Sequence, residues 1–122
     1  MPFPKPYKLI TISTDPERAS RMVRKIAEDV KDRYIIIHCV NAARIDEVES
    51  LVSLYRPDIL VCASMWSSDQ SAEIKRIART AVPGLRCYVV PQGMQAERGS
   101  EATTEHVKNQ LPKIIDGDLG LK

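Results

Sequence analysis

Short runs of consecutive apolar residues alternate along this chain with longer segments in which apolar residues recur every three or four positions. The runs cover residues 9–12, 34–40, 59–62 and 87–90, and they are rich in β-branched side chains. A run that is apolar at consecutive positions is typical of a strand buried on both faces, as in a parallel sheet. The sequence therefore predicts four buried strands.

The segments between the runs predict three amphipathic helices, because their apolar residues fall on one helical face. These residues are Ala19, Met22, Val23, Ile26, Ala27 and Val30, then Ile45, Val48, Val52 and Tyr55, then Ile74, Ile77, Ala78 and Ala81. Asp15 or Thr14 is suited to cap the first helix, with Pro16 near its first turn. The dipeptide Arg56-Pro57 is suited to end the second helix, because the residue before a proline disfavours helical backbone.

This order of strands and helices predicts an α/β fold, a three-layer α/β/α sandwich around a parallel sheet of four or five strands. A fourth helix is expected from Gly99 or Ser100 to Leu111, with Pro112 as its end. Residues 113–116 are then either a short fifth strand or a docked tail.

We expect a single domain over residues 1–122. Residues 1–7 contain three prolines and predict an extended arm. Residues 117–122 predict a frayed tail, because no further amphipathic helix fits there.

Composition narrows the class of protein. The 18 basic and 16 acidic residues nearly cancel, so no partner nucleic acid is expected. No apolar run approaches the roughly 20 residues of a membrane span, and no secretory signal begins the chain, which predicts a cytoplasmic protein without membrane contact. The three cysteines lack Cys-x-x-Cys spacing, so neither a disulfide framework nor a metal site is expected. Cys39, Cys62 and Cys87 fall in the apolar runs and are interpreted as core residues.

Three segments resemble the receiver domains of response regulators. Residues 12–17 read Ile-Ser-Thr-Asp-Pro-Glu, like the end of the family's first strand, and residues 55–61 read Tyr-Arg-Pro-Asp-Ile-Leu-Val, like the entry to its third. Residues 83–86, Pro-Gly-Leu-Arg, resemble the entry to its fourth strand. The resemblance spans residues 8–90 and implies the strand order 2-1-3-4, with a fifth strand at the end if one forms. An unrelated flavodoxin-like domain with the same layer order is the alternative.

The family's phosphoryl chemistry does not carry over to this sequence. In register, the acidic pair that holds Mg²⁺ falls on Ser13 and Thr14, and the phosphoacceptor aspartate falls on Ala63. A hard cation needs carboxylate oxygens, and an acyl phosphate needs a carboxylate. The resemblance therefore implies a pseudo-receiver that takes no aspartyl phosphate, with no catalytic residue and no cofactor.

Hydroxyl residues gather where the predicted strands end. Carboxyl ends of parallel strands meet at one edge of a sheet, and helix N-termini there favour anions. The candidates for binding an anionic ligand are Ser13, Thr14, Asp15, Ser64, Ser67 and Ser68. The alternative interpretation makes each of them a helix cap or a turn residue.

Other residues at this edge are candidates for contact with a protein partner: Met65, Trp66, Gln92 and Met94. Large apolar side chains at an exposed edge are typical of contact sites. For Trp66 the alternative is packing beneath the third helix. The basic residues Arg18, Arg21, Arg24 and Lys25 alternate with acidic ones and are interpreted as a solvated helix face rather than a phosphate site.

Two functions follow from these residues. The first is a non-enzymatic regulatory or scaffolding domain of pseudo-receiver type that works through protein contacts. The alternative is a small-ligand or anion-binding protein, or an enzyme subunit, that uses the serine-rich edge. A homodimer is also expected, formed by the open edge of residues 86–90 and the tail from Leu111 onward, because unpaired strand edges invite pairing.

Overall fold

The computed structural model describes residues 6–116. Strands and helices alternate in the order β1 (Pro6–Ile12), α1 (Pro16–Asp29), β2 (Ile35–Ala42), a 3-10 turn η1 (Ile45–Glu47), α2 (Val48–Tyr55), β3 (Ile59–Cys62), α3 (Ser68–Ala81), β4 (Arg86–Val89) and α4 (Met94–Asp116). The four predicted strands and the three helices between them are all present.

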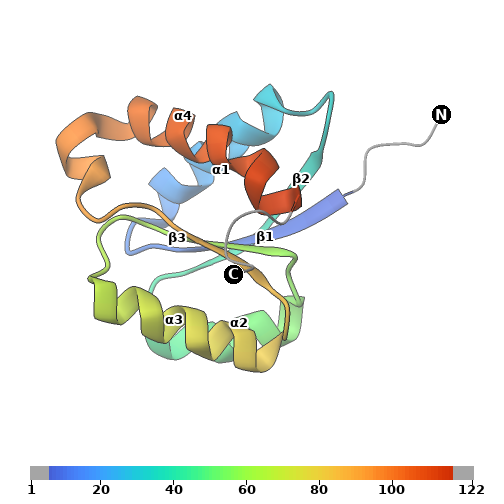
Figure 1. The fold of residues 1–122 in the computed structure, drawn as a ribbon, viewed down its shortest axis with the longest axis vertical. Helices are drawn as coiled ribbons and strands as arrows, with labels where there is room; N and C mark the ends of the chain where they lie inside the picture. The colour runs from blue at the N-terminus through green and yellow to red at the C-terminus, as the bar shows by residue number, and fades with distance from the viewer. Residues whose placement is uncertain (1–5, 117–122) are drawn as a thin grey trace.

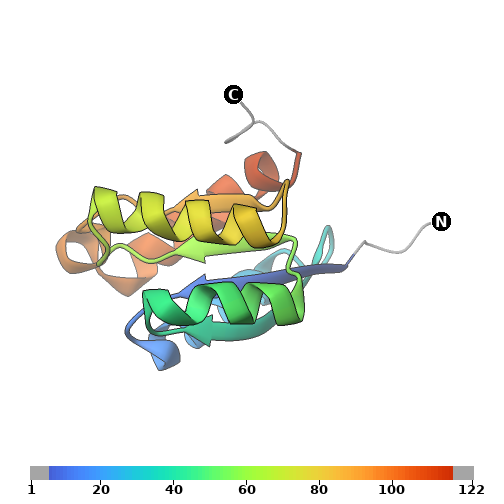
Figure 2. The same cartoon turned by 90° about the horizontal axis from the view of Figure 1, so that it is seen from below.

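The strands form one parallel sheet in the order β2-β1-β3-β4. Helices α1 and α4 cover one face of the sheet, and α2 and α3 cover the other (Figures 1 and 2). The molecule is thus a three-layer α/β/α sandwich of the flavodoxin-like kind. The predicted fold class and strand order are confirmed.

Each face of the sheet has its own apolar core, because successive strand residues point to opposite sides. Leu9 and Val61 pack with α1 and α4, whereas Ile10 and Leu60 pack with α2 and α3. All four side chains are at most 3% exposed. Burial on both faces explains why β1 and β3, the two central strands, have apolar residues at consecutive positions.

Local signals set the ends of the helices as predicted. The Asp15 carboxylate accepts a hydrogen bond from the Arg18 amide at 3.1 Å and caps α1, with Pro16 as its first residue. Helix α2 ends at Tyr55, and Arg56 then adopts the left-handed conformation with φ of 45°. Pro57 follows directly, so the chain turns into β3 without further helix.

The predicted end of the chain is partly wrong. The backbone breaks at Gly99, whose φ is 88°, so a helical segment does begin near Ser100 as predicted, but an unpredicted segment from Met94 precedes it within α4. Residues 113–116 continue the helix through Pro112, and the described part of the chain holds no fifth strand. A proline inside a helix removes one hydrogen bond, but here the helix on both sides of Pro112 has apolar side chains to bury. These side chains are Leu111, Ile114 and Ile115, which are 1%, 2% and 6% exposed.

The two chain ends also differ from expectation where they are described. Pro6 and Tyr7 belong to β1 and pair with Ile35 and Ile36 of β2, so the predicted arm is shorter than residues 1–7. Residues 1–5 and the predicted frayed tail at 117–122 lie outside the described residues. The tail from Leu111 was expected to join a dimer, but through residue 116 it packs on the core of its own chain.

None of the helices within residues 6–116 is long and apolar enough to cross a membrane.

Packing of α4 on the sheet yields a first prediction. Leu111→Ala should lower the free energy of unfolding by about 2–5 kcal/mol, because it removes a buried side chain and leaves a cavity. The same change at Leu54, which is 72% exposed on α2, should alter it by less than about 0.5 kcal/mol. Urea denaturation of both variants measures the difference. Equal destabilisation of the two would contradict the placement of α4.

Candidate functional site

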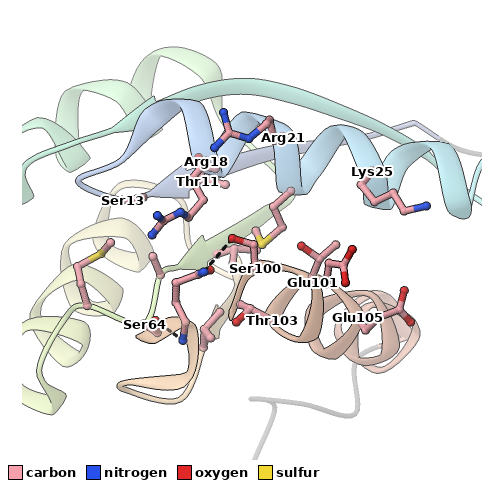
Figure 3. A pocket seen from close by; sticks show the side chains of 18 residues that line it. Thr11, Ser13, Arg18, Arg21, Lys25, Ser64, Ser100, Glu101, Thr103 and Glu105 are labelled. Carbon is pink, nitrogen blue, oxygen red and sulfur yellow. Dashed lines mark hydrogen bonds between the residues drawn. The ribbon is translucent and has the colours of Figure 1, made fainter. Parts of the chain in front are cut away.

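A pocket of about 430 Å³ opens between α1 and α4, above the carboxyl ends of the two central strands (Figure 3). Thr11 and Ser13 line it from the end of β1, and Val61, Ala63 and Ser64 line it from the end of β3. Small-molecule sites in proteins usually measure about 300–1,000 Å³, so the pocket has the volume of a ligand site.

The topology of the sheet also marks this position. From β1 the chain passes through α1 to β2 on one side, and after β2 it crosses to β3 on the other side of β1. Beyond the ends of β1 and β3 the connections therefore diverge, which leaves a crevice. Ligands of open α/β sheets bind at such a switch point. Volume and topology thus point independently to the same site.

The floor of the pocket is apolar. Val61 belongs to β3 and Val90 directly follows β4. Ala19 and Met22 come from α1, and Ala63 comes from the loop after β3. Val61 and Val90 are 1% and 2% exposed. An apolar floor of this kind favours a ligand with a hydrocarbon or aromatic body.

The two helical walls carry opposite charges. Helix α1 contributes Arg18, Arg21 and Lys25, and α4 contributes Glu101 and Glu105 on the other side of the opening (Figure 3). Steps of three and four residues keep each set on one face of its helix. The hydroxyl groups of Ser100, Thr103 and Thr104 also line the wall made by α4.

A polar network lies beside the pocket. The Thr11 hydroxyl donates to Asn41 Oδ1 at 2.7 Å, and Asn41 Nδ2 donates to the Ser13 carbonyl at 2.9 Å. His38 Nε2 lies 2.9 Å from the same Thr11 oxygen. Because the single Thr11 proton goes to Asn41, the Thr11 oxygen faces the histidine ring as an acceptor. The network therefore fixes the Thr11 hydroxyl at the pocket wall.

Burial lowers the pKa of His38 below its ordinary value, since it disfavours the charged ring, and a backbone hydrogen bond involving Val40 acts in the opposite direction. The second histidine, His106, is half-buried and bonds to the Tyr88 hydroxyl. Neither histidine lines the pocket.

The six residues predicted to bind an anion do not form one site. Ser13 and Ser64 line the pocket, but the Ser13 oxygen accepts the Asp15 amide at 3.0 Å and the Ser64 oxygen accepts the Gln95 amide at 3.2 Å. Asp15 caps α1, and Ser67 caps α3 on the opposite face of the sheet. The two remaining candidates, Thr14 and Ser68, are exposed and lie outside this pocket.

The four residues predicted to contact a protein partner also lie in different environments. Met65 is 41% exposed and lines the pocket, and Gln92 is exposed. Trp66 is 8% exposed, and its indole N–H donates to the Ile12 carbonyl at 2.9 Å in the core beneath α3. Met94 is 9% exposed in the core beneath α1 and α4. Packing is therefore the role of Trp66 and Met94, and Met65 and Gln92 stay on the surface.

The three cysteines lie against the core on the α2 and α3 side, as a core interpretation predicts. Burial raises the pKa of Cys62 to about 12, which keeps this thiol protonated. Among residues 6–116, no group of three or more His, Cys, Asp or Glu side chains is placed to hold a metal ion.

Sequence reasoning missed the wall that α4 contributes, from Ser100 to Glu105. The spacing of Glu101 and Glu105 shows that they share a helical face, but not that this face borders α1. Arg18, Arg21 and Lys25 were interpreted as solvated, and they are exposed, yet the same side chains border the pocket.

No protein-family model matches this sequence, and no curated protein is significantly similar to it. The strand order agrees with that of receiver domains, but many unrelated functions use this architecture. The function is therefore argued from the site.

The polar network yields a prediction about pH. The pKa of a histidine in an unfolded chain is about 6.5. A histidine whose pKa is lower than this in the folded state binds fewer protons there than in the unfolded chain. The contribution of His38 to stability is thus complete above about pH 6.5 and declines as the pH falls from there toward the folded pKa. Urea denaturation at several pH values between 7.5 and 5 should show a decline that is smaller in His38→Gln. An identical decline in both proteins would contradict the burial of this ring.

Proposed function

We propose that this chain is a small-molecule binding domain whose ligand occupies the pocket between α1 and α4. The observation that carries the proposal is an apolar-floored pocket of about 430 Å³ at the switch point of the sheet. The ligand is expected to bury an apolar body over Val61 and Val90 and to keep its polar groups near the two charged walls.

The pocket side chains favour binding over catalysis. In the part of the chain that the structure describes, the side chains that line the pocket include no histidine and no cysteine. The oxygens of Ser13 and Ser64 accept hydrogen bonds from backbone amides, and neither serine has a general base beside it among its hydrogen-bond partners. A serine nucleophile needs such a base to lose its proton. The proposal is therefore a non-enzymatic binding role.

A ligand in this position would bridge α1 and α4. Ser64 holds the start of α4, because its carbonyl accepts the Gly93 amide at 3.0 Å and its hydroxyl accepts the Gln95 amide. The backbone break at Gly99 separates this short first segment from the rest of the helix. The first segment lines the pocket through Gln95, so a ligand in contact with Gln95 would stabilise the position of this segment. A regulatory domain would thereby have a surface that responds to the ligand.

A variant in which a larger side chain fills the pocket tests this proposal. Ala63→Phe places an aromatic ring in the cavity, whereas Ala102→Phe adds the same ring on an exposed position of α4 that does not line it. The probe is anilinonaphthalene sulfonate, which combines an apolar body with an anionic group and fluoresces when it leaves water. The parent and Ala102→Phe should bind the probe at one saturable site, and Ala63→Phe should bind it about tenfold or more weakly, because a packed cavity has no room. Equal binding by all three proteins would contradict the proposal.

A second candidate function is protein contact, the role that the receiver resemblance implies. Within residues 6–116, β2 is an edge strand that pairs only with β1. Two large apolar side chains of this strand, Ile35 and Ile37, are 42% and 45% exposed. An unpaired edge with exposed apolar side chains favours addition of another strand. In a homodimer, β2 would pair antiparallel with β2 of a second copy around a twofold axis.

Light scattering at tens of micromolar tests this second candidate. The parent chain should be a dimer, and Ile37→Lys should be a monomer, because a charge on the edge strand opposes pairing. Leu54→Lys, which changes an exposed leucine of α2 outside the sheet, should remain a dimer. A monomeric parent chain would contradict the dimer.

A further inference from the structure

The charged side chains around the pocket differ in whether they already have a partner. Arg18 lies 3.5 Å from the Asp15 carboxylate, and Lys25 lies 3.2 Å from that of Asp29. On the other wall, Glu105 accepts from Lys108 at 2.9 Å. These three residues of the pocket wall are thus partly neutralised within the chain.

Arg21 and Glu101 are different. Among residues 6–116, neither forms an ion pair with any side chain, including each other. Arg21 lies on α1 and Glu101 on α4, at opposite sides of the opening (Figure 3). One positive and one negative group are therefore available to a ligand, and the apolar floor lies between the two walls.

From this arrangement we infer that the ligand is a zwitterion with an apolar body, and the inference rests on the proposed binding function. Its acidic group pairs with Arg21, and its ammonium or other cationic group pairs with Glu101. The body between the two groups covers Val61, Ala63 and Val90. Ser100 and Thr104 on the α4 wall offer hydroxyl groups for further hydrogen bonds.

The charges on the two walls disfavour ligands that carry charge of one sign only. A phosphate-rich molecule would meet the arginines but would also lie near Glu101 and Glu105, and like charges repel. A simple fatty acid would pair with Arg21 and leave Glu101 without a partner. A simple amine would pair with Glu101 and leave Arg21 without a partner. Only a ligand that carries both charges satisfies both walls.

Three probes with the same eight-carbon chain test the charge requirement: octanoate, octylamine and the aminooctanoate that carries its amine on the last carbon. Binding is followed by NMR titration of the backbone amides of Val61, Ala63 and Val90. Because exposed ion pairs contribute about 0.2–1 kcal/mol each, aminooctanoate should bind about 1.4- to fivefold more tightly than either single-charge probe.

Charge variants assign the preference to the two residues. Arg21→Glu should move the preference toward octylamine, and Glu101→Arg should move it toward octanoate. The double variant with both changes keeps opposite charges on the two walls and should again prefer aminooctanoate. Arg24→Glu is the control, because Arg24 is exposed on α1 but does not line the pocket.

The outcomes separate this inference from the function on which it rests. If all three probes bind equally and Ala63→Phe blocks them, the pocket binds ligands but the zwitterion inference is overturned. If no probe perturbs the pocket amides and Ala63→Phe leaves binding of the fluorescent probe unchanged, the proposed function itself fails. If Arg24→Glu changes the preference as much as Arg21→Glu, the effect is one of net charge, and the assignment to Arg21 is overturned.

Discussion

The docking of α4 against the sheet is the contact on which the rest of this structure depends. With four strands, the face that α1 covers would expose Val61 and Val90 unless a second helix lay beside α1. The apolar residues near the end of α4, from Val107 to Ile115, supply that cover. The ion pair of Lys108 with Asp29 at 3.3 Å joins the same two helices, and Lys25 together with Lys108 lowers the pKa of the Asp29 carboxyl.

The pocket exists because the cover is complete at one end of the face and incomplete at the other. Near the break at Gly99, α4 changes direction, and the Thr103 hydroxyl donates to the Gly99 carbonyl at 2.8 Å. Ser64 anchors the preceding segment through two hydrogen bonds to its backbone. Hydrogen bonds on both sides of the break therefore hold the opening between α1 and α4. The walls of the opening belong to the same two helices that form the core.

The sequence contained enough information for the central elements of the fold. Runs such as residues 59–62 are apolar on every position, which only burial on both faces explains, and Asp15 with Pro16 marks a helix start. The end of the chain was harder to predict because two rules conflict there. Pro112 disfavours helix, whereas Leu111, Ile114 and Ile115 have helical spacing. Burial of three large side chains outweighed the lost hydrogen bond, and that gain depends on a sheet face that is distant in sequence.

The candidate site depends even more on such distant contacts. Ser13 and Ser64 were predictable as residues at strand ends, because parallel strands bring their carboxyl ends together. That α1 and α4 would form the two walls of one pocket was not predictable, because it depends on the position of a helix that begins more than sixty residues after α1 ends.

The two parts of the site contribute differently to recognition. Apolar area removed from water stabilises a complex by about 25 cal/mol per Å², whatever the chemical identity of the ligand body. Because Val61 and Val90 are already only 1% and 2% exposed, this gain comes mainly from the apolar body of the ligand itself, and many bodies of suitable size would have it. Exposed charges such as Arg21 and Glu101 contribute much less each, but they discriminate by sign and position. Selectivity at this pocket thus belongs to its rim, where a single substitution can change the preferred ligand while the core beneath stays intact.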